Sequence, residues 1–407
     1  MPCQGDAHFY DHLKMVTQRL DDNLSSHGCP NAAYMRKYHK FAEDGVIRPP
    51  YARDADRILH SMAYTRYLDK TQVFFLVDDM QISHRALHVQ MVSRVARTIG
   101  RAFSLNEDLI EAISLAHDIG HPPFGHEGER ILDDIAKKVG TQGFAHAAQS
   151  YRWLELIEDR DLTLQVIDGI LSHNGEEDVY SLIPHREISV ESIDEKYERC
   201  LLGQDSLPST YEGCVVRLSD SIAYVGRDFI DAVNVNLLNE DDLEKFPDIC
   251  REMLEIDNVW EERATIERKV VDLLVKDLLC ASYNQEAIRL SDKGAEFLRA
   301  FKSFNFRLIC RSPYVTVNQE RMGRLFSLLY DYYLDELEHN RKDSRIFTDF
   351  LDENFVSQSY RDTVTPEQAV IDFLAGMRDG YFEARCAEII LPIHVTDFSR
   401  RICSCIR

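Results

Sequence analysis

One stretch of the chain, from His117 to Glu129, constrains its structure and chemistry more than any other. It reads His-Asp-Ile-Gly-His-Pro-Pro-Phe-Gly-His-Glu-Gly-Glu, with three histidines and three acids. Neighbouring acids repel one another unless a positive group lies between them. Imidazole and carboxylate are ligands of borderline and hard divalent cations. A lone buried histidine is more often a hydrogen-bonded core residue, but this cluster indicates a metal or catalytic site.

The residues before this stretch are predicted to form a helix over 106–116. Asn106 can cap its start, and Leu109, Ile113 and Ala116 fall on one face. The first histidine of the cluster therefore lies at the end of a helix that has one buried face. The prolines that follow end the helix, and the glycines allow a tight turn that brings later side chains back.

Apolar residues at helical spacing predict an all-α fold. We expect a peripheral segment over 1–50, a core over 51–240 and a helical lobe over 241–407 that packs on the core. The polar segment 185–210 is expected to consist mostly of loops. The main predicted helices cover residues 85–103, 211–233, 260–280, 293–306, 319–337 and 366–389.

Composition and charge exclude several classes of function. The formal net charge is −22, which argues against non-specific binding of DNA or of an anionic membrane. The ten cysteines are scattered and include no Cys-x-x-Cys pair, which is typical of reduced thiols. We see neither a membrane-length apolar run nor a signal-peptide pattern, and we therefore expect a cytoplasmic protein.

A second polar stripe lies on the predicted helix 211–233. Asp220, Tyr224 and Asp228 recur at four-residue spacing beside Arg227, so they share a face. Because apolar residues surround this stripe, its acids need a partner, and a metal is the simplest one. An internal Asp228–Arg227 pair is the alternative, although it leaves Asp220 unexplained.

Three cations near the start of the predicted core suggest a phosphate-rich ligand. Arg57 and Arg66 offer planar guanidinium groups, and Lys70 offers a compact ammonium group. Both kinds of group bind phosphates. A solvated helix with internal ion pairs explains them equally well. On the next helix, spacing alone leaves His84 and His88 as alternative ligands.

Two further histidines lie beyond the cluster. A helix after Gly143 would place His146, Gln149 and Ser150 on one face, either as a packed polar patch or as one wall of a ligand pocket. His173 follows an apolar helix and is interpreted as structural rather than catalytic.

With these residues in view, the chain resembles the HD-domain deoxynucleotide triphosphohydrolases of the dGTPase family. The likeness extends over roughly residues 50–390, and its ordered set of motifs is far more specific than a His-Asp pair alone. The matching segments are 57–61, Lys70-Thr71-Gln72-Val73, 105–113, 117–129, Gly143-Phe144 with His146 and Gln149-Ser150, 220–224 and 372–379.

The resemblance implies an HD-domain helical core and a divalent metal ion such as Mn²⁺ or Mg²⁺. It selects His88 over His84, and the implied ligands are His88, His117, Asp118 and Asp220. The implied reaction is hydrolysis of a dNTP to deoxynucleoside and triphosphate.

The resemblance also implies roles for the remaining site residues. His126 with Glu129 would handle protons, and His121 and His146 would contact the phosphates. Arg57, Arg66 and Lys70 would neutralise the triphosphate. Gln72 would lie near the sugar, while Tyr224 and Asp228 would position the sugar or a phosphate.

The family is commonly oligomeric, often as a hexamer, so we expect a homo-oligomer, with a second site for an activating nucleotide as a further hypothesis. The chain departs from the family pattern at Met91, where the family has an acid, and at Arg227, where His is common. Both departures bear on the substrate. The rival hypotheses are an HD phosphohydrolase for a monophosphate, cyclic nucleotide or alarmone, and a nucleotide-binding oligomer with vestigial activity.

Overall fold

The structure is a computed structural model that describes residues 7–38, 48–72, 83–174 and 179–391. Its architecture is all-α, as predicted. The two short strands, β1 (Ser181–Leu182) and β2 (Ile288–Arg289), pair antiparallel, with Ser181 opposite Arg289. Among the described residues, none of the helices combines the length and the apolar character that a membrane crossing demands.

The helices are numbered in chain order. In the first half of the chain they are α1 (Ala7–Asp22), α2 (Pro50–Leu59), α3 (Met62–Thr65), α4 (Arg85–Ala102), α5 (Glu107–Ala116), α6 (Gly125–Lys138), α7 (His146–Tyr151), α8 (Leu164–Leu171) and α9 (Val190–Leu201). In the second half they are α10 (Tyr211–Asn234), α11 (Glu240–Leu243), α12 (Asp248–Leu254), α13 (Val259–Ser282), α14 (Asp292–Asn305), α15 (Pro313–Glu338), α16 (Gln358–Thr363), α17 (Pro366–Ala375) and α18 (Asp379–Ile390). The described residues also form short helical turns, namely η1 (Asn31–Ala33), η2 (Arg66–Asp69) and the π-helical η3 (Arg152–Ile157), η4 (Phe306–Cys310) and η5 (Phe347–Leu351).

The centre of the molecule is the packing of α4, α5 and α10 on one another, with α2 against α5. The apolar stripe of α4 is buried, including Val92, Ala96 and Ile99. Asn106 caps α5 as predicted, because its side chain accepts hydrogen bonds from the amides of Asp108 and Leu109. Burial of these stripes supplies the main driving force for the arrangement.

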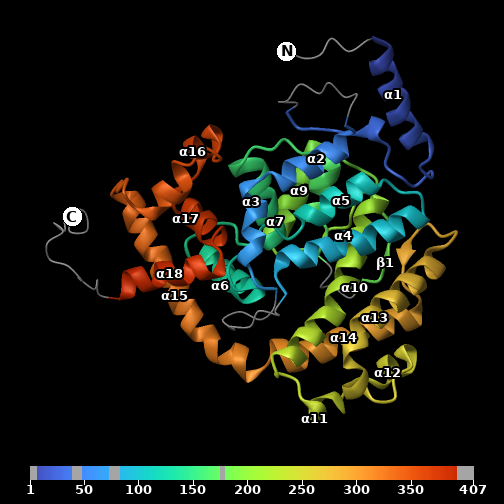
Figure 1. Cartoon of the computed structure of the whole chain (residues 1–407). Coiled ribbons are helices and arrows are strands. Elements are labelled where there is room, and N and C mark those ends of the chain that lie inside the picture. Colours follow the sequence, from blue (N-terminus) through green and yellow to red (C-terminus); the bar gives the residue numbers. More distant parts are fainter. Residues whose placement is uncertain (1–6, 39–47, 73–82, 175–178, 392–407) are drawn as a thin grey trace.

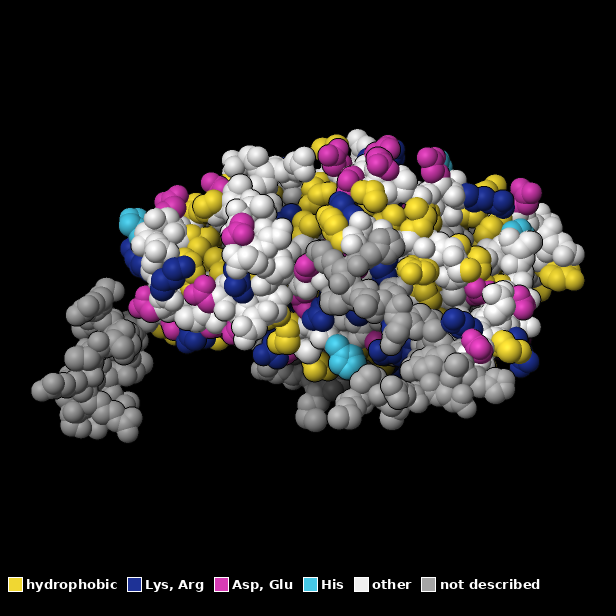
Figure 2. All heavy atoms as spheres, turned by 90° about the horizontal axis from the view of Figure 1, so that it is seen from above, with side chains coloured by type: hydrophobic (Ala, Val, Ile, Leu, Met, Phe, Trp, Pro, Cys, Tyr) yellow, Lys and Arg dark blue, Asp and Glu magenta, His cyan; other side chains and the backbone are white. Residues whose placement is uncertain are grey.

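The C-terminal helices pack on this centre from two sides. The helices α13 and α14 pack on α10, while α15 and α17 pack on α6 (Figure 1). The space-filling view in Figure 2 shows a face on which acidic and basic side chains are interspersed.

Two predictions about elements are wrong. The segment 185–210 contains α9, whose start is capped by Ser189. The predicted helix over 366–389 is two helices, α17 and α18, with Gly376 at the break. A Cβ at Gly376 would lie 2.3 Å from the Trp153 ring, so close packing on that ring requires glycine, and the chain turns there.

Candidate metal centre

The four predicted metal ligands come together in the core, although they belong to three segments of the chain. His88 lies on α4, His117 and Asp118 follow α5, and Asp220 lies on α10. The Nε2 atom of His88 lies 3.0 Å from Oδ1 of Asp220 and 3.7 Å from Oδ2 of Asp118. The Nε2 atom of His117 lies 3.5 Å from Oδ1 of Asp118 and 3.8 Å from Oδ1 of Asp220. This buried cluster is able to hold a divalent cation.

The ring of His117 is oriented as a metal ligand should be. Its Nδ1 lies 2.8 Å from the carbonyl oxygen of Ser114, so Nδ1 carries the proton and donates it. The lone pair of Nε2 then points at the two carboxylates. Among the described residues this buried Nε2 has no hydrogen-bond partner. A metal-binding histidine typically donates its other N–H to a carbonyl in this way, so the residues fit a cation.

Arg85 belongs to the centre, and the sequence analysis missed it. Its buried Nη1 donates to Oδ2 of Asp118 at 2.7 Å. Burial raises the pKa of the Asp118 carboxyl, but the neighbouring rings of His117 and His121 and the Arg85 guanidinium outweigh it and hold that pKa well below its usual range. Asp118 is therefore an anion. The one available signal was spacing, since Arg85 lies three residues before His88 on the same helix face.

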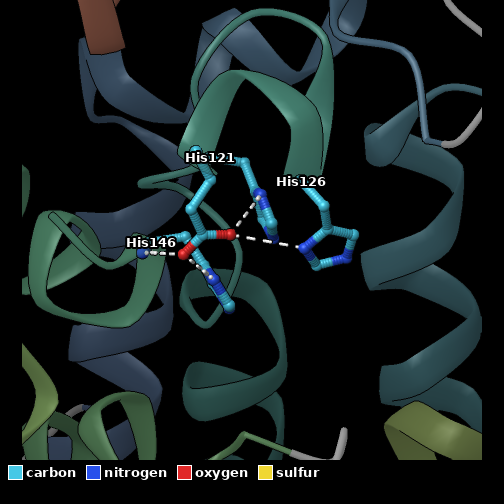
Figure 3. A group of neighbouring side chains, drawn as sticks. His121, His126 and His146 are labelled. Carbon is cyan, nitrogen blue, oxygen red and sulfur yellow. Dashed lines mark hydrogen bonds and ion pairs between the residues drawn. The ribbon is translucent and has the colours of Figure 1, made fainter. Parts of the chain in front are cut away.

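A second group of side chains meets around the carboxylate of Glu129 (Figure 3). Its Oε1 lies 2.8 Å from Nδ1 of His146. Its Oε2 lies 3.3 Å from Nδ1 of His126 and 3.9 Å from Nδ1 of His121. The rings of His121 and His146 stack with centroids 3.9 Å apart. The four predicted catalytic residues therefore lie together, with Nε2 of His121 3.3 Å from Oδ1 of Asp118.

These residues differ in exposure and in charge. The side chain of His126 is 57% exposed, whereas that of His121 is 2% exposed. Burial raises the pKa of Glu129, but His146, His126 and His121 outweigh it and hold that pKa well below its usual range. Glu129 is thus an anion next to His126. Because its ring is exposed, His126 can exchange protons with solvent.

His173 lies inside the cluster, a position that the sequence analysis did not foresee. Its Nε2 lies 3.0 Å from Nε2 of His146 and 3.8 Å from Oδ1 of Asp118. Its Nδ1 lies 2.6 Å from the carbonyl oxygen of Ile170. No local pattern connects this histidine with the central stretch, because their proximity results from the packing of α8 against α5 and α7.

The helix α7 supports the loop that follows His117 through the side chain of Ser150. The Ser150 hydroxyl donates to the His117 carbonyl at 2.7 Å and accepts from the Gly120 amide at 2.8 Å. A Cβ at Gly120 would lie 2.1 Å from the carbonyl oxygen of His146, so the close approach requires glycine. The polar face predicted for this helix is thus a packed patch beside the metal centre.

A small cavity adjoins the centre and is lined by the residues predicted to contact the sugar side of a substrate. Its walls include Gln72, His88, Met91, Tyr224, Arg227 and Asp228. Burial raises the pKa of Asp228 to about 7. Arg227 pairs with Asp231 at 3.1 Å, so the alternative of an internal Asp228–Arg227 pair is wrong.

The three cations predicted to bind phosphates contact groups of the protein. Arg57 donates to the carbonyl of Asp161 at 2.7 Å and lies 3.4 Å from Asp54. Arg66 is half-buried, with its guanidinium 3.6 Å from the centroid of the Trp153 ring. Burial lowers the pKa of Arg66 to about 10.

Lys70 is buried, and it donates to the carbonyls of His121 and Ala375. Each of the three cations is thus held by protein groups. Contact of these three cations with the substrate phosphates stays a prediction.

Comparison with family models finds two matches. Residues 85–224 match the HD domain, and residues 288–388 match the phosphohydrolase-associated domain. The first range contains all four predicted metal ligands, as well as His126, Glu129 and His146.

Curated relatives cover nearly the whole chain. A protein of Caldanaerobacter subterraneus subsp. tengcongensis is 31% identical over 93% of this chain and 96% of its own length. One of Desulfatibacillum aliphaticivorans is 31% identical over 92% and 97%, respectively. One of Clostridium perfringens is 30% identical over 88% and 94%. Each is described as a deoxyguanosinetriphosphate triphosphohydrolase-like protein.

Proposed function

Because the chain belongs to the deoxyguanosinetriphosphate triphosphohydrolase-like family of HD-domain phosphohydrolases, we propose that it hydrolyses dGTP or several dNTPs to deoxynucleoside and inorganic triphosphate. The observation that carries this proposal is the juxtaposition of two groups of side chains. The His/Asp cluster able to hold a cation lies beside a set of histidines gathered around Glu129. Phosphoryl hydrolysis needs charge neutralisation and proton transfer at one place.

The ligands in this proposal are His88, His117, Asp118 and Asp220. When bound there, a divalent ion such as Mn²⁺ or Mg²⁺ supplies a Lewis acid that lowers the pKa of water and polarises a phosphoryl oxygen. Arg85 keeps Asp118 anionic and oriented through its 2.7 Å hydrogen bond.

His126 and Glu129 form the proposed proton-handling pair. The carboxylate orients the ring of His126 and favours its protonated form, and the exposed ring can exchange its proton with solvent. His121, which stacks on His146 and faces Asp118, is proposed to contact a phosphate. Across the small cavity, Gln72, Tyr224 and Asp228 are proposed to contact the sugar side of the substrate.

A product assay tests the proposal. The full chain is incubated with each of the four dNTPs and with Mn²⁺ or Mg²⁺, and the products are separated by anion exchange. We expect one tripolyphosphate for each deoxynucleoside released. Release of orthophosphate or pyrophosphate would contradict the proposed reaction. A nucleoside monophosphate, a cyclic nucleotide and a guanosine alarmone serve as rival substrates in the same assay.

Three expectations from the sequence stay predictions beside this proposal. They are assembly into a homo-oligomer, activation by a nucleotide at a second site, and a cytoplasmic location. Sedimentation velocity tests the first, and turnover with and without a second nucleotide tests the second.

A further inference from the structure

Phe124, the residue that precedes α6, has a backbone conformation that a bulky residue rarely adopts. Its φ is 63° and its ψ is 25°, which lie in the left-handed region. That region is costly for a residue with a large side chain, and such a residue stays there only where its surroundings hold it. His126 and Glu129 follow in the first turns of the helix. The direction in which α6 presents these two side chains therefore depends on the contacts that hold Phe124.

The contacts that hold Phe124 come from the C-terminal helices. Its amide donates to Oδ1 of Asp379, the first residue of α18, at 3.2 Å. Its buried ring packs edge-to-face on Phe382 of α18 and on Phe326 of α15, with centroids 5.2 Å and 6.2 Å away, respectively. All three partners belong to residues 288–388, which match the phosphohydrolase-associated domain. This domain thus holds the strained residue by its backbone and by its side chain.

The carboxylate of Asp379 is itself held in one orientation. Its Oδ2 accepts hydrogen bonds from the hydroxyl of Thr71 at 2.7 Å and from the amide of Thr71 at 3.2 Å. Asp379 is buried, and a buried carboxylate is stable only where donors satisfy it. The bonds from Thr71 therefore fix the place at which the carboxylate receives the amide of Phe124.

From these contacts we propose that Asp379 is a positioning residue for the reaction, and that it acts on His126 and Glu129 through the amide of Phe124. The inference rests on the proposed function, because it gives that reaction a residue from outside the HD-domain match. His126 and Glu129 follow Phe124 closely in the chain, so a shift of the backbone at Phe124 moves both side chains. A displacement of about 1 Å at a catalytic group can cost about a hundredfold in rate. The associated domain thus contributes to the reaction by fixing the start of α6.

The kinetics of Asp379→Ala in the dNTP assay with Mn²⁺ test the inference. The variant leaves the amide of Phe124 without its acceptor, and we expect kcat to fall about 10–100-fold. KM and the affinity for Mn²⁺ should stay the same, because the metal ligands are unchanged and the displaced pair acts in the transition state. Tyr381→Phe is the matched control on α18, since it removes a hydrogen bond to Asp349 and should keep the natural kcat. A natural kcat in Asp379→Ala, an equal loss in both variants, or a loss confined to KM would overturn the proposal.

A second variant and a second measurement cover the case in which Asp379→Ala fails to fold. Asp379→Asn keeps the shape of the side chain but has one acceptor oxygen for donors on two sides, so kcat should fall by a smaller factor. Exchange of the backbone amides over residues 121–130, measured by mass spectrometry without nucleotide, should be faster in Asp379→Asn than in the natural protein. Unchanged exchange would refute the inference. Faster exchange in a protein that leaves every dNTP intact would refute the proposed function and confirm that Asp379 holds the start of α6.

Discussion

The Nε2 of His88 on α4 lies 3.0 Å from Oδ1 of Asp220 on α10, so the packing of these two helices decides whether the metal centre exists. The contact lies in the interior, and both helices bury their apolar faces in the same core. Burial raises the pKa of Asp220, but His88 and His117 outweigh it and leave that pKa below its usual value. The pair is thus a carboxylate beside an imidazole, and a cation can bind to both.

Replacing Asp220 tests the ligand assignment. Asp220→Ala removes one ligand, and the loss of several kcal/mol of charge stabilisation should lower kcat by about a thousandfold. Ion content and product release measure the effect. Asp292→Ala, at a fully exposed acid, is the control and should behave like the natural protein. Unchanged turnover in Asp220→Ala would show that the assigned ligands are wrong.

Removal of the Arg85 charge should weaken the centre without removing a ligand. Arg85→Met leaves one oxygen of Asp118 without its 2.7 Å donor. Loss of such a supporting partner typically costs about 10–100-fold in metal affinity or activity, and we expect a shift of that size in a Mn²⁺ titration. Arg94→Gln, at an exposed position of α4, should leave the titration unchanged. Equal titrations for the two variants would argue against this role of Arg85.

Substitution of Lys70 separates a structural from a phosphate-binding role. Lys70→Met leaves the carbonyls of His121 and Ala375 without their donor, which should lower the free energy of unfolding by about 2–4 kcal/mol. Chemical denaturation measures the change, and the exposed Lys137→Met serves as control. If Lys70 instead contacted substrate, KM for the dNTP would rise while stability stayed the same.

The buried acid Glu155 should make stability depend on pH. Burial raises its pKa to about 8, so the folded state holds a proton that the unfolded state releases near pH 4.5. Its contribution to stability is therefore complete below pH 4.5 and is lost as pH rises through 8, at up to about 1.4 kcal/mol per pH unit.

Glu155→Gln should flatten this part of the stability curve and stabilise the protein at pH 8 relative to the natural chain. Denaturation at a series of pH values is the measurement, and the exposed Glu198→Gln is the control. A parallel pH profile for Glu155→Gln and the natural protein would contradict the raised pKa.

The parts of the fold that local patterns govern were predictable. The boundaries of α5 follow from its cap and apolar stripe, and the spacing on α10 places Asp220 and Tyr224 on one face because a helix repeats every 3.6 residues. The need for glycine at position 376 was not predictable, since it depends on the Trp153 ring, which lies far away in the sequence.

The sequence by itself determined the helical class and the central His117–Glu129 stretch, because cap, stripe and turn signals act between near neighbours. Only the tertiary structure decided which side chains meet there. It brought in Arg85 and His173, and it placed Lys70 on two carbonyls. The physical reason is that a cation or an imidazole has the same local sequence signature whether its partner is a ligand or the protein, and the partner is set by the packing of distant helices.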